Sequence, residues 1–267
     1  MADTQIHRTA VVHPEARLGN GVVVGPLSVV EEHVTLGAGC ILGPQVIVTG
    51  HTVVGARNRF HAGAVVGDAP QDFKYAGSPT RLRIGDDNVF REHVTIHRSN
   101  TLDDDTVIGS GNLFMVGSHA GHNCVVGNQN IFANGSLLAG HVTVADRAFI
   151  SGNCLVHQFT RIGRLAMMQG GSAISRDLPP FCVARGDNGI CGLNVVGLRR
   201  LGFDSAQRLE LRALYHLLFR SQRKLADLLL EARGKYLSGP AQEMIDFVAG
   251  AQKGVCRDTG KLEISDE

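Results

Sequence analysis

The 267-residue chain contains no tryptophan, and aromatic residues make up only 5% of it. Glycine, in contrast, occurs 33 times. Few bulky side chains and many glycines argue against a thick globular core and favour a thin, repetitive β structure. Because 43% of the residues are hydrophobic, such a structure can still bury a core.

An excess of charge of one sign is also missing, since the formal net charge at pH 7 is only +1. The composition therefore gives no electrostatic reason to expect nucleic acid or a membrane surface as a partner. No run of 18 apolar residues occurs, so no membrane span is expected, and residues 1–21 lack the apolar stretch of a secretory signal. The six cysteines include no CxxC pair, which predicts reduced thiols and a cytoplasmic location.

The dominant positive feature is a hexapeptide repeat. Apolar residues, Leu102 included, occupy the positions divisible by six from Ile6 to Ile174, and only Asp72 and Ser78 interrupt the series. The residue after each apolar position is often glycine, and the residue four places later is small or β-branched. Internal periods of this kind indicate repeat architectures, in which each unit packs on its neighbour.

A hexapeptide period fits neither an α-helix nor an ordinary alternating strand, and it predicts a parallel β-helix of short strands and corners. Three hexapeptides would form one triangular coil, and the coils would stack at ~4.8 Å. The aliphatic and small residues would point inward, and glycine would supply an unusual φ and ψ at the corners. The repeat then forms about nine coils.

Two segments depart from the repeat. Residues 68–83, DAPQDFKYAGSPTRLR, add twelve positions before the register resumes, and residues 97–107, HRSNTLDDDTV, keep the phase but lose the glycine corners. Both are predicted to be excursions from the rigid coil, and such loops are common locations for function.

The period changes after the repeat. Residues 175–189 are rich in proline and glycine and predict a connector, and from Asp204, a good helix cap, the apolar spacing becomes helical. Three helices are predicted around Leu211–Leu218, Leu225–Ala232 and Met244–Val248, with Gly239-Pro240 as a break and a frayed end from about Lys253. The sequence therefore predicts an all-β parallel β-helix domain at 1–190 and a C-terminal helical domain at 191–267.

The stretch GSHAGHNC (117–124) places two histidines beside one corner of the repeat. No histidine of the repeat occupies an inward slot, so none is expected to be a buried core residue, and His119 and His122 are predicted to point outward. One coil further along the chain from His122 stands Gly140, and one coil beyond that stands Gln158. These three residues are predicted to form a column, with His141 and His157 at its side.

The residues alone leave three interpretations of this column open. A polar face with scattered histidines needs no function. A metal site between prisms would use histidine ligands, as in a hexapeptide-repeat carbonic anhydrase, but the His-x-x-His spacing matches that family poorly. A general base would take a proton from a sugar hydroxyl as it attacks an activated acyl group, with the Gly140 N–H facing the oxyanion. Cys124 falls in a small inward slot, which favours packing over reactivity.

Six stretches, in order and spacing, make the sequence similar to one family of hexapeptide-repeat enzymes. They are QDFKYAG (71–77), TIHRS (95–99), SHAGHNC (118–124), LAGHV (138–142), VHQF (156–159) and GLRRLGF (197–203). The family is that of the acyl-(acyl-carrier-protein)–UDP-N-acetylglucosamine O-acyltransferases of lipid A biosynthesis, and the resemblance covers nearly the whole chain. It implies a left-handed β-helix, despite the right-handed rule for parallel crossovers, and a homotrimer.

The resemblance also implies an activity. The family transfers an (R)-3-hydroxyacyl group from the thioester of acyl carrier protein to the 3-hydroxyl of UDP-N-acetylglucosamine, without a metal or other cofactor. His122 would be the general base and Gly140 the oxyanion donor. Substrate-binding roles are implied for Asp72 and Lys74 on the first excursion, His97 beside it, His119, His141, His157 and Gln158 in a cleft between subunits, Gly170 at the acyl-length position, and Asn194 and Arg200 at the nucleotide.

Some positions differ from the pattern of the best-known members. Asn123 stands where an aspartate often follows the base, so a carboxylate partner for His122 is left open. Val196 and Leu201 replace polar residues of the nucleotide segment, which keeps N-acyl transfer to a 3-amino UDP-sugar as an alternative. Gly170 predicts a deep acyl channel, although Met167 and Met168 could shorten it.

A second alternative is a non-catalytic trimeric scaffold that binds carrier protein or nucleotide. Between residues 199 and 224 the chain has seven basic and two acidic residues. This local positive charge on a nearly neutral chain predicts steering of an acidic carrier protein, which both the enzyme and the scaffold could use.

Overall fold

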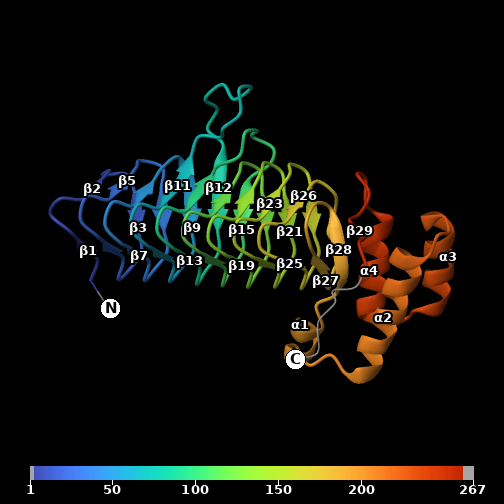
Figure 1. Cartoon of the computed structure of the whole chain (residues 1–267). Helices are drawn as coiled ribbons and strands as arrows, with labels where there is room; N and C mark the ends of the chain where they lie inside the picture. Colours follow the sequence, from blue (N-terminus) through green and yellow to red (C-terminus); the bar gives the residue numbers. More distant parts are fainter. Residues whose placement is uncertain (1–2, 261–267) are drawn as a thin grey trace.

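A computed structural model describes residues 3–260 of the chain. Its repeat forms a long three-sided prism of stacked short strands, and four helices gather at the C-terminal end of this prism (Figure 1). Within the described residues the strands form three sheets of twelve, nine and eight strands, which we call the first, second and third face.

The faces consist of the following strands. The first face has β1 (Gln5–Ile6), β4 (Val23–Val24), β7 (Ile41–Leu42), β10 (Arg59–Phe60), β13 (Val89–Phe90), β16 (Leu113–Phe114), β19 (Ile131–Phe132), β22 (Phe149–Ile150), β25 (Met167–Met168), β27 (Cys182–Ala184), β28 (Gly189–Leu193) and β29 (Arg257–Asp258). The second has β2 (Val11–Val12), β5 (Val29–Val30), β8 (Ile47–Val48), β11 (Val65–Asp68), β14 (Thr95–His97), β17 (His119–Ala120), β20 (Leu137–Leu138), β23 (Leu155–Val156) and β26 (Ala173–Ile174). The third has β3 (Arg17–Leu18), β6 (Thr35–Leu36), β9 (His51–Val54), β12 (Arg81–Ile84), β15 (Thr106–Ile108), β18 (Val125–Val126), β21 (Thr143–Val144) and β24 (Arg161–Ile162).

The predicted coil of three hexapeptides is confirmed by the strand register. Parallel neighbours pair at this spacing, as in Val126 with Val144. The first excursion lengthens one coil to five hexapeptides, since Val54 pairs with Ile84, and the second lengthens the next coil to four, since Ile84 pairs with Ile108. Both insertions are whole hexapeptides, which is why the inward phase is kept.

The inward slots are filled as predicted except at Leu102 and at Ile6, which is 50% exposed in the first coil. Four phenylalanines at apolar slots stack along the axis with ring centroids 4.4–5.2 Å apart: Phe60, Phe90, Phe114 and Phe132. Leu102 was expected to point inward but is 55% exposed, because the second excursion carries it off the prism. Several small slots hold buried asparagines, whose side chains bond to one another from coil to coil.

Most of the glycines that follow an apolar residue have a different role from the predicted one, although Gly67 does have a positive φ of 85°. Gly37 and Gly55 do not have positive φ. A Cβ at Gly37 would instead lie 2.4 Å from the backbone of Gly55 in the next coil, so glycine is required for close stacking. Positive φ occurs two residues further on, for example at Arg57 (φ 56°) and Asn123 (φ 56°).

The C-terminal region contains four helices: α1 (Val195–Arg200), α2 (Ser205–Arg220), α3 (Leu225–Lys235) and α4 (Gly239–Ala249). Asp204 caps α2 through a capping box with Gln207, as the sequence suggested. The short helix α1 was not predicted. The predicted break between the last two helices is present, and Gly239-Pro240 forms the first two residues of α4.

Three predictions for the C-terminal part of the chain need correction or remain untested. The connector 175–189 contains β27 and the first residue of β28, and the segment expected to fray from Lys253 instead adds β29 alongside β28. Residues 261–267 of that segment lie outside the described residues. The proposed domain boundary at 190/191 falls within β28, so the division into two domains remains a prediction.

Candidate active site

The predicted stacking of His122 and Gly140 is present at the corner that follows the second face. His122 follows β17 and Gly140 follows β20, and these two strands are paired neighbours in successive coils. A Cβ added at Gly140 would lie 2.6 Å from both Nε2 and Cε1 of His122. The imidazole therefore packs directly against the glycine backbone, and a side chain at position 140 would displace it.

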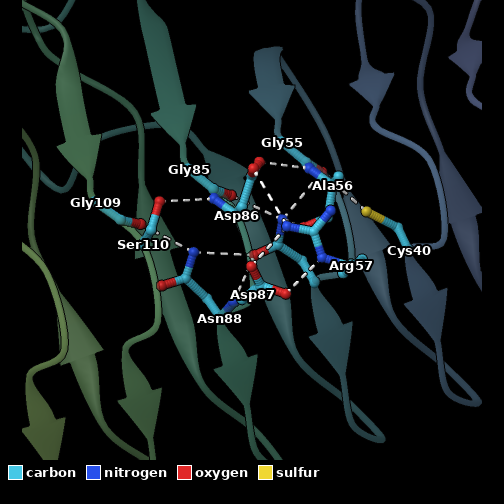
Figure 2. A network of polar contacts seen from close by, with 11 residues as sticks. Cys40, Gly55, Ala56, Arg57, Gly85, Asp86, Asp87, Asn88, Gly109 and Ser110 are labelled. Carbon is cyan, nitrogen blue, oxygen red and sulfur yellow. Dashed lines mark hydrogen bonds and ion pairs between the residues drawn. The ribbon is translucent and has the colours of Figure 1, made fainter.

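The corners of the third face show how a side chain of the next coil can accept the N–H at the equivalent position (Figure 2). The Ala56 N–H donates to Asp86 Oδ1 at 2.7 Å, and the Asp86 N–H donates to Ser110 Oγ at 2.9 Å. The Gly140 N–H has no such acceptor anywhere in residues 3–260. A free amide beside an imidazole can donate to an oxygen on which negative charge develops.

The hydrogen bonds around His122 determine which ring nitrogen carries the proton. His122 Nδ1 lies 2.9 Å from Asn123 Oδ1, and the same oxygen accepts the Asn100 N–H at 3.0 Å. Because that N–H can only donate, the atom facing both groups must be the amide oxygen, and Nδ1 must donate to it. Nε2, on the side of Gly140, is then unprotonated and can act as a base. Asn123 is anchored in turn by its own N–H, which donates to Thr106 Oγ1 at 2.8 Å.

Three further histidines surround His122. Burial lowers the pKa of His119 from 6.5 to about 4, and burial also lowers the pKa of His97 and of His141. The His119 ring meets the His97 ring edge-on at 4.9 Å, and the His141 ring meets His122 edge-on at 5.1 Å while stacking on Phe159 at 4.5 Å. These rings are neutral near pH 7 and can offer both a donor and an acceptor to a substrate.

His97 is buried outside the prism interior, so it does not contradict the prediction that no histidine of the repeat is a buried core residue. Its exposure is only 7%, although it points away from the prism interior. Its strand β14 pairs with β11, where Asp68 is its partner across a register shift. Both excursions begin at this pair, and their polypeptide rises from the prism on this side (Figure 1). An outward side chain is therefore covered by loops that a strict repeat would not contain.

The first excursion brings Asp72 into contact with the second. Asp72 Oδ2 accepts a hydrogen bond from Asn100 Nδ2 at 2.7 Å, and Oδ1 accepts the Lys74 N–H at 3.0 Å. These bonds, the Lys74 amide first, lower the pKa of the Asp72 carboxyl, and the charge of His122 contributes in the same direction. The Lys74 side chain is exposed. Asn100 was not among the sequence candidates, because no repeat position predicts its contacts.

A groove of about 700 Å³ runs along the second face beside the column. Leu137, Leu155 and Ile174 form an apolar floor, while His119 and His157 give it a polar edge. Gln71 of the first excursion also lines it. Ala139, next to Gly140, also lines the groove, whereas His122 and Gly140 themselves do not. An apolar trough with a polar edge suits a ligand with an aliphatic chain and a polar head.

The remaining predicted residues lie in different places. Gln158 is exposed at the end of the column, where its carbonyl accepts Lys253 Nζ at 3.2 Å. Gly170 follows β25 of the first face. Asn194 caps α1 and donates to the Leu165 carbonyl at 3.0 Å, and Arg200 is exposed at the end of α1. In one chain, α1 and the excursions lie on opposite sides of the prism (Figure 1), so the structure does not bring Asn194 and Arg200 to the column.

Cys124 is fully buried, and burial raises the pKa of its thiol to about 12, as expected for a packing role. In the described part of the chain, no group of three or more histidine, cysteine, aspartate or glutamate residues is arranged to hold a metal ion. No helix between residues 3 and 260 is long and apolar enough to cross a membrane.

Known proteins resemble this chain in sequence and in fold. The family model "Udp N-acetylglucosamine O-acyltransferase; Domain 2" matches residues 177–256. The acyl-(acyl-carrier-protein)–UDP-N-acetylglucosamine O-acyltransferase of Myxococcus xanthus is 46% identical over 95% of this chain and 99% of its own length. The corresponding enzyme of Alkalilimnicola ehrlichii is 47% identical over 95% of this chain and 100% of its own.

The chain belongs to this O-acyltransferase family. The solved structure of LpxA from Acinetobacter baumannii, 38% identical, superposes with a TM-score of 0.91 over 94% of this chain and 99% of that chain. The left-handed β-helix implied by the resemblance is confirmed for this member. As a member of the family the protein is an acyltransferase, and the non-catalytic scaffold has no support.

Proposed function

We propose that this acyltransferase transfers an (R)-3-hydroxyacyl group from acyl carrier protein to the 3-hydroxyl of UDP-N-acetylglucosamine, in lipid A biosynthesis. The names of its relatives supply the donor and acceptor classes. The observation that carries the proposal is the contact between the His122 ring and Gly140, whose N–H is unpaired within the described residues. A base and an oxyanion donor within one crevice are what acyl transfer to a hydroxyl requires.

The reaction proceeds in two steps. His122 Nε2 takes the proton of the sugar hydroxyl as that oxygen attacks the thioester carbonyl, and the Gly140 N–H donates to the resulting oxyanion. The tetrahedral intermediate then collapses, the C–S bond breaks, and the imidazolium returns its proton to the departing thiolate. The acyl group arrives already activated, so the steps need no metal.

The substrates extend in two directions from His122. The acyl chain lies along the apolar groove past Leu137 and Leu155, and the sugar lies toward Asp72 and the neutral rings of His119 and His141. Asn194 and Arg200 act on the nucleotide bound at a neighbouring copy in a homotrimer, because in their own chain they lie across the prism from the column. Gly170 limits the acyl chain by the space left open at its corner, and the reaction takes place in the cytoplasm.

The test is acyl transfer by purified His122→Ala with 3-hydroxyacyl carrier protein as donor. We expect kcat to fall by about 10²–10⁴-fold with an unchanged fold, because the general base is lost. His13→Ala, near the other end of the second face, is the matched control and should retain full activity. A fully active His122→Ala enzyme would contradict the mechanism, and parallel assays with the sugar and its 3-amino analogue separate O-transfer from N-transfer.

A further inference from the structure

The base in the proposed reaction has a neutral partner. Asn123 accepts from Nδ1 of His122 and orients the ring, but its amide carries no net charge. When His122 takes a proton, the imidazolium is stabilised only by charges at longer range. Our inference about the group that supplies such a charge rests on the proposed function and extends it.

Among the described groups with a shifted pKa, four are influenced by the charge of His122. Three are the histidines 97, 119 and 141, and burial lowers the pKa of each, so they are neutral when His122 works near pH 7. The fourth is Asp72, an acid whose pKa is lowered by hydrogen bonds and by His122. Asp72 is thus the anion among these four groups, and its position relative to His122 determines how strongly it attracts an imidazolium.

Asn100 connects this anion to the base. Its Nδ2 donates to Asp72 Oδ2 at 2.7 Å, and its backbone N–H donates at 3.0 Å to the Asn123 oxygen that also accepts from His122. Asn100 is half-buried, and its Oδ1 is fully buried without a partner in the described chain. One residue thus bonds the carboxylate on one side and the partner of the base on the other.

We propose that Asn100 is a positioning residue that holds Asp72 as the counter-charge for the imidazolium of His122. The first excursion then has two functions, since the carboxylate that faces the sugar also stabilises the charge formed during proton transfer. The role of an aspartate bonded directly to the base is divided here between a neutral orienting amide, Asn123, and a carboxylate held by Asn100.

Two substitutions of Asn100 separate this role from simple loop support. Asn100→Ala keeps the backbone N–H that orients Asn123 but releases Asp72. Asn100→Asp replaces the donor by a carboxylate and so adds negative charge near the base. The acidic limb of the kcat/KM profile, where the base becomes protonated, should move to lower pH in the first variant and to higher pH in the second.

We expect Asn100→Ala to lower kcat/KM about tenfold at neutral pH, because the transition-state charge loses an attractive partner. Asn100→Ser keeps a hydroxyl donor for Asp72 and should restore much of the activity and the wild-type limb. Thr101→Ala, at the exposed neighbouring position, is the matched control and should change neither quantity. The titration of His122, followed by NMR of histidine-labelled full-length protein, gives the same comparison without turnover.

Shifts of opposite sign in the two Asn100 variants support the proposal. The proposal is overturned if both Asn100 variants lose activity equally while the acidic limb and the NMR titration of His122 stay at the wild-type pH. Asn100 would then only support the loop. A wild-type protein with no acyl transfer, but with opposite NMR shifts in the variants, contradicts the proposed function while the coupling of Asn100, Asp72 and His122 stands.

Discussion

Gly140 leaves its corner open to the ring of His122. At four corners of the third face a side chain of the next coil accepts the N–H at the equivalent position, as Ser110 does for Asp86. Gly140 has no side chain, its N–H is unpaired in the described structure, and the His122 ring occupies the space where a Cβ would be. The space for the His122 ring and the free N–H donor beside it therefore both depend on Gly140.

Gly140→Ala is expected to reduce kcat by about 10²-fold, because the new methyl group pushes the imidazole away from its productive position. The contact is only 2.6 Å, which no Cβ tolerates without movement. Gly152→Ala is the matched control: it is also a corner glycine, and its Cβ would make an ordinary contact of 3.4 Å. Steady-state kinetics and crystallographic inspection of the His122 ring check the prediction, and equal activity of both variants would refute it.

His119 makes the folded protein sensitive to acid. Its pKa is about 4 when folded and 6.5 in the reference state, so between these values the unfolded chain binds more protons at this site. The free energy of unfolding therefore rises with pH across this window. As the pH falls from 6.5 toward 4, protonation of His119 lowers this free energy by at most about 3 kcal/mol. Urea unfolding at pH 7.5 and pH 5 measures the difference.

His119→Gln should show a smaller loss between these two pH values than the wild-type protein. His7→Gln, at an exposed position of the first coil, provides the comparison and should behave as the wild type does. An unchanged pH dependence in His119→Gln would mean that the neutral ring of His119 is not what opposes protonation.

At the scale of elements, the prism is held together by two ladders that run along its axis. One is the phenylalanine stack, and the other is a line of buried asparagines: Asn58, Asn88, Asn112 and Asn130. Asn88 donates to Asn58 Oδ1 at 2.9 Å and to the Gly109 carbonyl at 2.9 Å, and its own oxygen accepts from Asn112. Each coil thus satisfies polar groups of the next where water is excluded.

Asn88→Ala is expected to lower the free energy of unfolding by about 2–4 kcal/mol, because it leaves buried donors and acceptors of two neighbouring coils without partners. Asn128→Ala, which removes an exposed corner cap on the third face, should cost much less. Denaturant unfolding of both variants makes the comparison, and a larger loss in Asn128→Ala would contradict it.

At the scale of the whole molecule, Arg161 joins the last helix to the end of the prism and also makes an ion pair with a buried aspartate. Arg161, on β24, bonds the Asp177 carboxylate at 2.7–2.8 Å, and the Asp177 side chain is only 3% exposed. The same guanidinium donates to the backbone carbonyl of Phe247 in α4 at 2.9 Å, and it lies 4.4 Å from the centre of the Phe247 ring. The end of the repeat and the last helix therefore share one side chain.

Arg161→Ala is expected to destabilise the protein by about 3 kcal/mol, since it leaves a buried carboxylate without its partner. Arg57→Ala, which breaks an exposed pair with Asp87, should have no measurable effect. Calorimetry measures the stability, and hydrogen exchange should quicken in α4 while the first coils of the repeat remain protected. Uniform exchange in the variant would contradict this link.

The sequence alone determined the register of the prism, because each hexapeptide repeats the same local requirement for one apolar and one small inward residue. From this register followed the coil of three hexapeptides, the inward place of Cys124, and the approach of His122 to Gly140. The role of the corner glycines was mistaken, since close approach between coils is a property of stacking and not of the local chain.

Only the tertiary structure decided what the excursions do. Asn100 lies 28 residues from Asp72 and 23 from Asn123 in the sequence, and no period relates them, so their contacts could not be predicted. The burial of His97 and the return of β29 to the prism have the same origin. Because the repeat is local, the scaffold can be predicted from the sequence. The protonation state and charge of the site depend instead on two segments that leave the repeat and contact each other outside it.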